Sequence, residues 1–428
     1  MNEDNKPDII TTNAGPDTIG IYFNNGSGIF ALPITYSTDS EPQHLVAADV
    51  NGDNKVDIIV ANVWGYNIGV FLNIGNGAFA PQVTYSTGIN PRSVAAADVN
   101  GDSKIDIIVA NELSNNVGVF LNNGIGTFAP QATYSTGSNS APYSVTTADI
   151  DGDSKIDIIV ANSGSNDVGV LLNNGNGAFA SQVTYSTSSN PRSLAAADVN
   201  GDSKIDIIVA NVDSNNVGVF LNNGDGTFAP QATYSTGSNS APYSVTTADI
   251  DGDSKIDIIV ANSGSNDVGV LLNNGNGAFA SQVTYSTSSN PRSLAAADVN
   301  GDSKIDIIVA NVDSNNVGVF LNNGDGTFAP QATYSTGSNS APNSVTTADV
   351  NGDSKVDIIV ANRLANNIGV FLNNGNAMFA SQVTYSTGVY GPIWVAAADV
   401  NADNRVDLIV MNTGTGSNIV NVLLSACI

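Results

Sequence analysis

The segment AAADVNGDSKIDIIVAN, residues 195–211, determines how the rest of the chain is interpreted. Close versions of it recur along the chain, with their first Asp at positions 49, 98, 149, 198, 249, 298, 349 and 399. The spacing is 49 to 51 residues, and residues 126–242 reappear unchanged as 226–342. A constant period of this length is the signature of a repeat architecture, and the identical 100-residue offset indicates tandem duplication of a pair of repeats.

Each repeat contains short apolar segments bounded by turn residues. In the repeat that begins near residue 194 they are Leu194–Val199, Asp206–Ala210, Val217–Leu221 and Phe228–Ser235. Their β-branched and aromatic residues favour strands, and no stretch shows a sustained helical period. Four antiparallel strands in each unit of about 50 residues are typical of a β-propeller blade. We therefore predict an all-β propeller, with an open β-solenoid as the competing architecture.

The number of blades follows from counting strands. The second and third segments occur nine times each and the first and fourth eight times, giving 34 strands, which is not a multiple of four. Joining the C-terminal inner strand, Trp394–Val400, to N-terminal strands would complete a composite blade and leave two strands over. We predict eight blades in a single domain over residues 1–428, with incomplete repeats at both ends. Seven or nine blades, and an origin in a longer array, are the alternatives.

The turn between the first and second strands carries the candidate chemistry. Counted from its first Asp, the loop 198–206 has oxygen-bearing side chains at positions 1, 3, 5 and 9, and position 7 can add its backbone carbonyl. Calcium takes six to eight oxygen ligands in flexible geometry, which suits oxygens at alternate positions of a tight loop. The glycine stands at position 4 and strands flank the loop, so this is not an EF-hand. An ordinary turn is the alternative for one loop, but the pattern occurs eight times.

The predicted metal-binding residues occupy positions 1, 3, 5, 7 and 9 of these loops. They are Asp49, Asn51, Asp53, Lys55 and Asp57; Asp98, Asn100, Asp102, Lys104 and Asp106; Asp149, Asp151, Asp153, Lys155 and Asp157; Asp198, Asn200, Asp202, Lys204 and Asp206; Asp249, Asp251, Asp253, Lys255 and Asp257; Asp298, Asn300, Asp302, Lys304 and Asp306; Asp349, Asn351, Asp353, Lys355 and Asp357; and Asp399, Asn401, Asp403, Arg405 and Asp407. At the N-terminus Asn2, Asp4 and Asp8 match positions 3, 5 and 9, but position 1 is missing, so this ninth site should be weak or empty.

The charge balance supports cation binding and excludes other partners. Acidic residues outnumber basic ones by 39 to 13, a formal net charge of −26, which would repel nucleic acid. Eight Ca²⁺ ions would add 16 charges and bring −26 to −10. No apolar run approaches the length that spans a membrane. We therefore expect Ca²⁺ to be structural and coupled to folding.

These motifs carry a family resemblance. The core VAAADVNGD…KxDIIVAN, followed by NNGxGxF, resembles the FG-GAP/VCBS repeat of integrin α-subunit propellers and of many secreted or surface proteins, including a fungal propeller lectin. The resemblance covers nearly the whole chain and implies a propeller with Ca²⁺ on one face, used for adhesion or ligand binding. It does not specify the ligand, because one fold hosts many functions.

The face opposite the calcium loops is the predicted recognition face, because it carries the longer and more variable connections. Its candidate anchors are arginine and aromatic residues: Trp64, Tyr66, Arg92, Arg192, Arg292, Tyr143, Tyr243, Arg363, Tyr390 and Trp394. The alternative is that they are turn residues that pack between blades. His44, the only histidine, is expected to be incidental.

The sequence predicts a binding module and not an enzyme. One histidine, one terminal cysteine and aspartates assigned to metal leave few candidates for a nucleophile and base. A calcium-dependent polysaccharide-degrading domain and a purely structural spacer are the alternatives. A glycan ligand predicts equivalent pockets between blades, whereas a protein partner predicts one asymmetric patch. We expect a monomer that works outside the cell or at its surface, where sites of this type fill with calcium, although residues 1–8 show no signal peptide.

Overall fold

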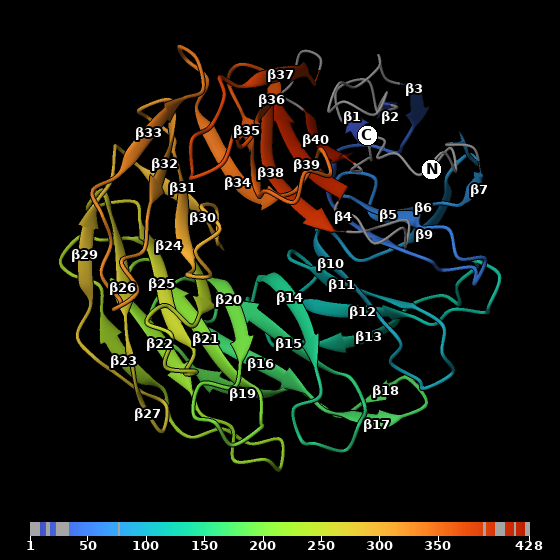
Figure 1. Cartoon of the computed structure of the whole chain (residues 1–428). Coiled ribbons are helices and arrows are strands. Elements are labelled where there is room, and N and C mark those ends of the chain that lie inside the picture. Colours follow the sequence, from blue (N-terminus) through green and yellow to red (C-terminus); the bar gives the residue numbers. More distant parts are fainter. Residues whose placement is uncertain are drawn as a thin grey trace.

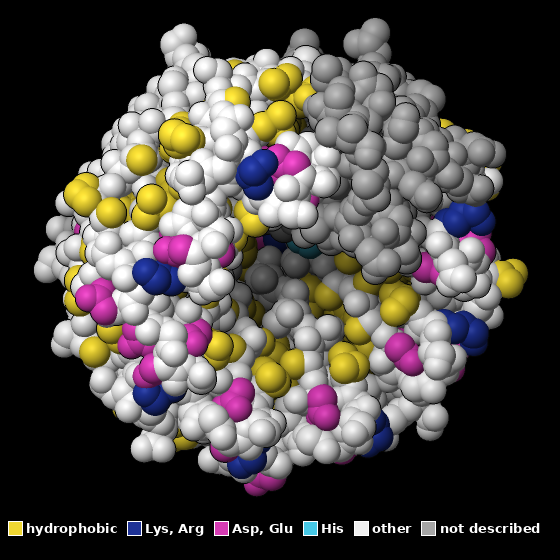
Figure 2. All heavy atoms as spheres, in the orientation of Figure 1, with side chains coloured by type: hydrophobic (Ala, Val, Ile, Leu, Met, Phe, Trp, Pro, Cys, Tyr) yellow, Lys and Arg dark blue, Asp and Glu magenta, His cyan; other side chains and the backbone are white. Residues whose placement is uncertain are grey.

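The computed structural model describes residues 9–13, 18–22, 34–75, 78–387, 391–398, 407–414 and 417–423. Every regular element in these ranges is a β-strand. The strands form sheets arranged around a central axis, with the first strand of each repeat innermost and the fourth at the periphery (Figure 1). Figure 2 shows the hollow at the centre of this ring. None of the described residues belongs to a helix long and apolar enough to cross a membrane.

Seven sheets have four antiparallel strands each, ordered from the axis outward as the sequence predicts. The inner strands are β4 (Pro42–Ala48), β10 (Pro91–Ala97), β14 (Pro142–Ala148), β20 (Pro191–Ala197), β24 (Pro242–Ala248), β30 (Pro291–Ala297) and β34 (Pro342–Ala348). The second strands are β5 (Asp57–Asn62), β11 (Asp106–Asn111), β15 (Asp157–Asn162), β21 (Asp206–Asn211), β25 (Asp257–Asn262), β31 (Asp306–Asn311) and β35 (Asp357–Asn362).

The outer half of each blade completes the sheet. The third strands are β6 (Asn67–Phe71), β12 (Asn116–Phe120), β16 (Asp167–Leu171), β22 (Asn216–Phe220), β26 (Asp267–Leu271), β32 (Asn316–Phe320) and β36 (Asn367–Phe371). The fourth strands are β9 (Val83–Ser86), β13 (Ala132–Ser135), β19 (Val183–Ser186), β23 (Ala232–Ser235), β29 (Val283–Ser286), β33 (Ala332–Ser335) and β37 (Val383–Ser386). Small ribbons in three of the 3–4 turns pair β7 (Asn73–Gly75) with β8 (Ala78–Phe79), β17 (Asn173–Gly175) with β18 (Ala178–Phe179), and β27 (Asn273–Gly275) with β28 (Ala278–Phe279).

The eighth blade is built from both ends of the chain. It has six strands in the order β3-β2-β1-β40-β39-β38. They are β1 (Ile9–Asn13), β2 (Thr18–Tyr22), β3 (Ile34–Ser37), β38 (Gly391–Ala398), β39 (Asp407–Gly414) and β40 (Ser417–Leu423). The eight blades and the two additional strands are confirmed. The predicted junction was wrong, because β1 pairs with β40, Ile9 opposite Leu423, and not with the inner strand β38.

The core lies between the blades. Every residue of the second strand β21 is buried, as expected for a strand covered on both faces. Ile208 and Val217 of one blade pack with Ile258 and Val260 of the next, and the same cluster recurs around the ring. At the outer edge, Tyr234 meets Phe279 of the next blade edge-on, with ring centroids 5.4 Å apart.

An asparagine just after the third strand fastens six of the described blades to the blade before. Asn173, 4% exposed, donates from Nδ2 to the carbonyl of Val99 in the preceding blade at 2.7 Å and to that of Ile156 in its own blade at 2.9 Å. Its Oδ1 accepts from the Gly175 amide at 2.9 Å. Equivalent bonds to the preceding blade come from Asn122, Asn222, Asn273, Asn322 and Asn373. We call these residues the asparagine clamps.

Replacing one clamp should destabilise the propeller measurably. Asn173→Ala would remove the donor from the buried Val99 carbonyl and from the partly buried Ile156 carbonyl, and an unsatisfied buried group costs about 1–3 kcal/mol. We expect a lower midpoint in thermal and chemical denaturation. Ser138→Ala, at an exposed loop position, is the control and should leave the midpoint unchanged. Equal midpoints for Asn173→Ala and the native protein would show that the clamp contributes no stability.

Candidate metal centre

Seven of the eight predicted loops lie in the described residues, each between an inner strand and its second strand. In the loop 198–206 the carboxylate of Asp198 is the hub. Its Oδ1 accepts from the Gly201 amide and its Oδ2 from the Ser203 amide, both at 2.7 Å. The same bonds to positions 4 and 6 recur in all seven loops. Of the eighth loop only Asp407 falls in a described strand; Asp399, Asn401, Asp403 and Arg405 lie outside the described residues, as do Asn2, Asp4 and Asp8.

The backbone takes left-handed conformations at two points to make this wrap. Gly201 at position 4 has φ 77° and Ser203 at position 6 has φ 64°. Glycine was expected at position 4, but the role of position 6 was missed. Its signal is visible in the sequence, because position 6 is always Asn or Ser, and Asn tolerates this region better than most residues.

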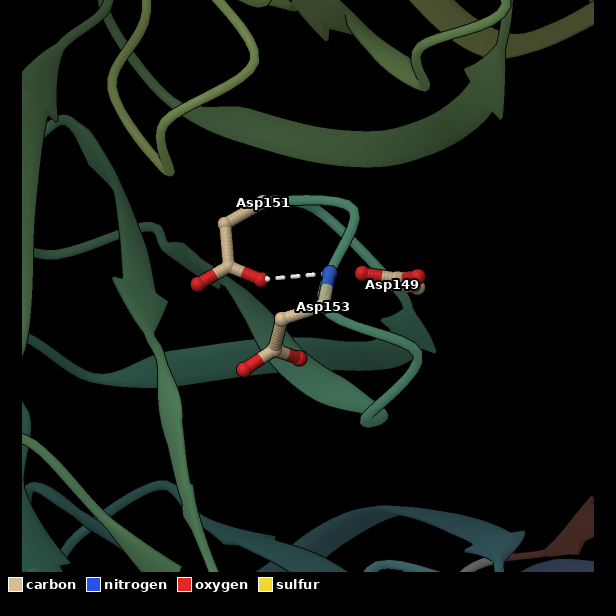
Figure 3. A group of neighbouring side chains, drawn as sticks. All are labelled: Asp149, Asp151 and Asp153. Carbon is tan, nitrogen blue, oxygen red and sulfur yellow. Dashed lines mark hydrogen bonds between the residues drawn. The ribbon is translucent and has the colours of Figure 1, made fainter.

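The side chains at positions 1, 3 and 5 converge. Figure 3 shows Asp149, Asp151 and Asp153 around one turn, with the amide of Asp153 donating to Asp151 Oδ1 at 3.2 Å. One carboxylate oxygen from each of these residues lies within 4.8 Å of the others, and Asp249, Asp251 and Asp257 form a similar group. With calcium–oxygen distances of 2.3–2.6 Å, ligands on opposite sides of one ion lie up to about 5 Å apart. The carboxylate spacing therefore fits a calcium ion.

The Asp at position 9 is buried at the base of the loop. Asp257 has no exposed surface, and it accepts from the Ile250 amide at 2.8 Å and from the Asn273 amide at 2.7 Å. Burial raises the pKa of Asp257 to about 6, against the effect of the two amide hydrogen bonds. The same cause raises the pKa of Asp57, Asp157 and Asp306 to about 6 and that of Asp357 to about 7.

The Lys at position 7 was expected to contribute only its carbonyl. The structure adds an ion pair, because Lys104 Nζ lies 2.7 Å from Asp102 Oδ2 at position 5. This hydrogen bond lowers the pKa of the Asp102 carboxyl. Similar pairs occur in the other six described loops. The ammonium group places one positive charge beside carboxylates that would otherwise repel one another.

Three acidic residues of the predicted ligand set are therefore brought together in each of two described loops, at positions 1, 3 and 5 in one and at positions 1, 3 and 9 in the other. These carboxylates could supply side-chain oxygens to a hard divalent cation, and position 7 could add a carbonyl. The asparagine clamps connect the loops of adjacent blades. Asn222, which is not one of the predicted ligands, donates to the carbonyl of Ile150, at position 2 of the preceding loop, at 2.7 Å.

Two further features lie away from these loops. Between blades, a pocket of about 550 Å³ is lined by Thr233, Tyr234 and Gly237 of one blade and by Phe279, Gln282 and Thr284 of the next. An equivalent pocket of about 470 Å³ is lined by Thr133, Tyr134, Gly137, Phe179, Gln182 and Thr184. Several hydroxyl groups, one amide and aromatic rings surround each pocket. We call these two cavities the seam pockets.

The predicted recognition residues are divided by the structure. Trp64, Tyr66 and Arg363 are exposed at 2–3 turns. Arg92, Arg192, Arg292, Tyr143 and Tyr243 instead line a cavity on the propeller axis. Tyr390 and the side chain of Trp394 lie outside the described part of the chain.

His44 is not an incidental turn residue. It lines the axial cavity, and its Nδ1 accepts from the Val94 amide of the next blade at 3.3 Å. Burial, with a smaller contribution from Arg92, lowers the pKa of His44 to about 4, so the ring is neutral at pH 7.

A family model described as an FG-GAP-like repeat matches the chain in eight overlapping segments, residues 1–60, 49–109, 98–160, 149–209, 198–260, 249–309, 298–360 and 349–410. This confirms the resemblance drawn from the sequence motifs. No curated protein matches the chain in a sequence search.

Solved structures with a similar fold include a lectin of Agrocybe aegerita that recognises non-reducing terminal N-acetylglucosamine, at 21% identity and TM-score 0.51, covering 90% of this chain and 91% of the lectin. A streptogramin B lyase has 15% identity and TM-score 0.51, with 78% and 93% of the chains covered. A 6-phosphogluconolactonase candidate from Bacteroides uniformis has 19% identity and TM-score 0.51, with 76% and 95% covered. At these identities the likeness shows the propeller fold alone.

These structures correct one prediction. The sequence was interpreted as that of a protein that is not an enzyme. This prediction was wrong, because the same fold also occurs in a streptogramin B lyase. The scarcity of histidine and cysteine is no ground for excluding catalysis by a propeller.

The raised pKa of the position-9 carboxyls predicts opposite pH responses with and without divalent ions. Asp257 has a folded pKa of about 6 against an ordinary 3.8, so the metal-free folded state binds more protons than the unfolded chain between these values. Its stability should therefore rise as the pH falls from 7 to 5. Bound calcium requires the deprotonated carboxylates, so its stabilising effect should shrink over the same range.

Thermal denaturation in chelator and in calcium, at pH 5 to 7, measures both slopes. Asp257→Asn should make the metal-free slope shallower by the contribution of one carboxyl, whereas Asp213→Asn, at an exposed residue of the same charge, should leave the slope unchanged. Parallel slopes in chelator and in calcium would contradict the assignment of these carboxyls to a metal site.

Proposed function

The chain belongs to the FG-GAP-like repeat family, and from this premise we propose that it is a calcium-stabilised propeller that binds glycans in its seam pockets. The observation that carries the proposal is the equivalence of these two pockets, 100 residues apart in the sequence and lined by the same residue types. Equivalent pockets are what a repeated sugar ligand requires, and they would act together through multivalency.

The chemistry of the pocket suits a neutral sugar. Thr, Ser and Gln side chains offer donors and acceptors for hydroxyl groups, and Tyr234 and Phe279 offer apolar surface for the face of a ring. Gln282 is held in place, because its Nε2 donates to the Thr236 carbonyl of the preceding blade at 3.1 Å and its Oε1 accepts from Asn262 Nδ2 at 3.2 Å. A pre-organised amide of this kind lowers the entropy lost on binding.

Part of the pocket extends toward the predicted recognition face, and Phe279 adds a residue from the 3–4 turn, on the face of the acidic loops. Ser265 comes from a 2–3 turn, and Thr236 and Gly237 from a connection between blades. Both kinds of connection lie on the face opposite the cation loops, because successive strands are antiparallel. Metal and ligand would therefore act at different places, the ion holding the blades and the seams holding the sugar.

We propose that Ca²⁺ occupies the eight loops and that the protein works outside the cell or at its surface, where calcium is plentiful. The convergent carboxylates support the ion, and the formal charge of −26 supports several of them. The site residues of the eighth loop, Asp399, Asn401, Asp403, Arg405 and Asp407, belong to this proposal by their sequence alone.

Calcium should raise the stability of the protein in proportion to the number of filled loops. A free ion concentration of 100 Kd adds about 2.7 kcal/mol for each independent site. Thermal melts with chelator and with calcium measure the total, and titration calorimetry measures the stoichiometry. Asp149→Asn should bind one ion fewer than the native protein, whereas Asp213→Asn, which removes the same charge from an exposed turn, should keep the native number. Identical melts with and without calcium would overturn the proposal.

Filling the seam pockets should abolish glycan binding and leave the fold intact. Thr184 and Thr284 line the pockets from exposed strand positions, and Thr384 is their sequence equivalent. We expect a glycan array in calcium to show ligands for the native protein, and Thr184→Trp, Thr284→Trp and Thr384→Trp together to remove them. The matched control replaces the preceding residues, Val183, Val283 and Val383, whose exposed side chains point to the other face of the strand.

A blank array for the native protein would refute the glycan ligand. It would favour a protein partner at the 2–3 turns, where Trp64 and Leu113 of neighbouring blades are 63% and 62% exposed. Loss of binding in the valine controls as well would show a general defect of the strands and not a blocked pocket.

A further inference from the structure

The inner strands share an irregularity at their first residues. Each begins with a register shift against its second strand, between Pro91 and Ser93 in β10 and between Pro191 and Ser193 in β20. The residue between them is the extra residue of a β-bulge, a feature that redirects a side chain. Around the ring the bulge residues are Gln43, Arg92, Tyr143, Arg192, Tyr243, Arg292, Asn343 and Ile393.

Six of these residues, from Arg92 to Asn343, line one cavity of about 340 Å³ on the propeller axis. This size falls within the range of small-molecule pockets, about 300–1,000 Å³. The central hollow is visible in Figure 2, and His44 also lines the cavity. The bulges therefore gather one side chain from each of several blades at the axis.

Arginine and tyrosine alternate in this ring and make cation–π contacts with one another. Arg92 Cζ lies 4.8 Å from the centroid of the Tyr143 ring, and Arg192 Cζ lies 5.5 Å from Tyr143 and 5.8 Å from Tyr243. Arg292 Cζ lies 5.0 Å from Tyr243. A guanidinium group held over an aromatic ring by cation–π attraction keeps its N–H groups available as hydrogen-bond donors.

Part of this donor capacity is not used by the protein. Arg192 donates from Nε to Asn190 Oδ1 at 3.3 Å, and among the described residues its Nη atoms have no acceptor. Arg292 donates from Nη1 to Asn343 Oδ1 at 3.2 Å, while its buried Nε has no partner in the described part of the protein. The guanidinium groups thus present fixed donors to a shared space.

The charge of the cavity is opposite to that of the protein. The chain has 39 acidic and 13 basic residues, yet three of its arginines line this cavity and none of the described lining residues is Asp or Glu. Like charges at one site repel, and an anion placed among them would relieve that repulsion. Paired guanidinium donors in a fixed plane match the oxygens of carboxylate, sulfate and phosphate groups.

We propose that the axial cavity binds a small oxyanion-bearing ligand, a carboxylate or a tetrahedral oxyanion, through Arg192 and Arg292 with Arg92, between the rings of Tyr143 and Tyr243. The site is separate from the seam pockets and does not depend on the proposed glycan binding. It takes one ligand at the axis, whereas the seam pockets take several.

Titration calorimetry in calcium at low ionic strength tests the site with three probes. Sulfate represents a tetrahedral oxyanion, galacturonate a carboxylate, and galactose is the neutral counterpart of galacturonate. We expect at least one anion to bind with a stoichiometry of one, to bind more weakly as salt is added, and to be favoured over galactose. Which anion binds identifies the source of the oxygens.

Arg192→Gln should weaken binding of the anion by about tenfold or more, because it removes a charge-assisted hydrogen bond. Arg192→Lys keeps the charge but not the planar fork and should also lose affinity. The control is Arg363→Gln, which removes the same charge from an exposed turn and should bind as the native protein does. Melting curves confirm that the variants fold.

Failure of both anions to bind the native protein would overturn the proposal. Equal weakening by Arg192→Gln and Arg363→Gln would overturn it as well, because the anion would then respond only to overall charge. Loss of anion binding with an intact glycan array, or the reverse, separates this site from the seam pockets.

Discussion

The propeller depends on a hydrogen-bonded chain that runs from one cation loop to the next. The buried Asp at position 9 accepts from the backbone amide of its blade's asparagine clamp, as Asp206 does from Asn222 at 2.8 Å. The side chain of that clamp then reaches the carbonyl at position 2 of the preceding loop, Ile150. A change at one loop is therefore transmitted to the base of its neighbour. An ion that fixed a loop would also fix the edge against which the adjacent blade packs, so the proposed metal binding would stabilise the ring through this geometry.

This coupling explains how a ring with so few charged pairs in its core holds together. The apolar strands supply buried apolar area but do not specify the register between blades, because identical Ile and Val side chains would pack equally well in several registers. The register is specified by individual contacts toward the outside of the core. The clamps and the edge-on Tyr–Phe pairs each connect one named residue to one position in a neighbouring blade, and the buried aspartates hold the clamp residues from within their own blade. These contacts fix the register between neighbouring blades, and the apolar core packs in the register that they fix.

The repeat, the four-stranded blades, the 34 blade strands and the position of the acidic loops between first and second strands could all be predicted from the sequence, because each rests on local periodicity and spacing. The junction between β1 and β40 could not, since both ends offer strands of the same type and only the closed ring selects the pair. The clamps were hidden because Asn222 stands before Asn-Gly, where it looks like an ordinary turn residue. The bulges could not be predicted, because a register shift depends on how two strands pair and neither strand's sequence alone reveals it.

The duplicated pair of repeats gives the axis a property that a single repeat could not. Had every inner strand carried Arg at its bulge, neighbouring guanidinium groups would face one another without a ring between them. Had every strand carried Tyr, the cavity would hold no charge. Alternation places Tyr143 between Arg92 and Arg192, and Tyr243 between Arg192 and Arg292, so each ring separates two like charges and attracts both. A cationic cavity in a protein of net charge −26 thus follows from copying two repeats as one unit. The same doubling spaces the two seam pockets one full unit apart, one blade pair from the other.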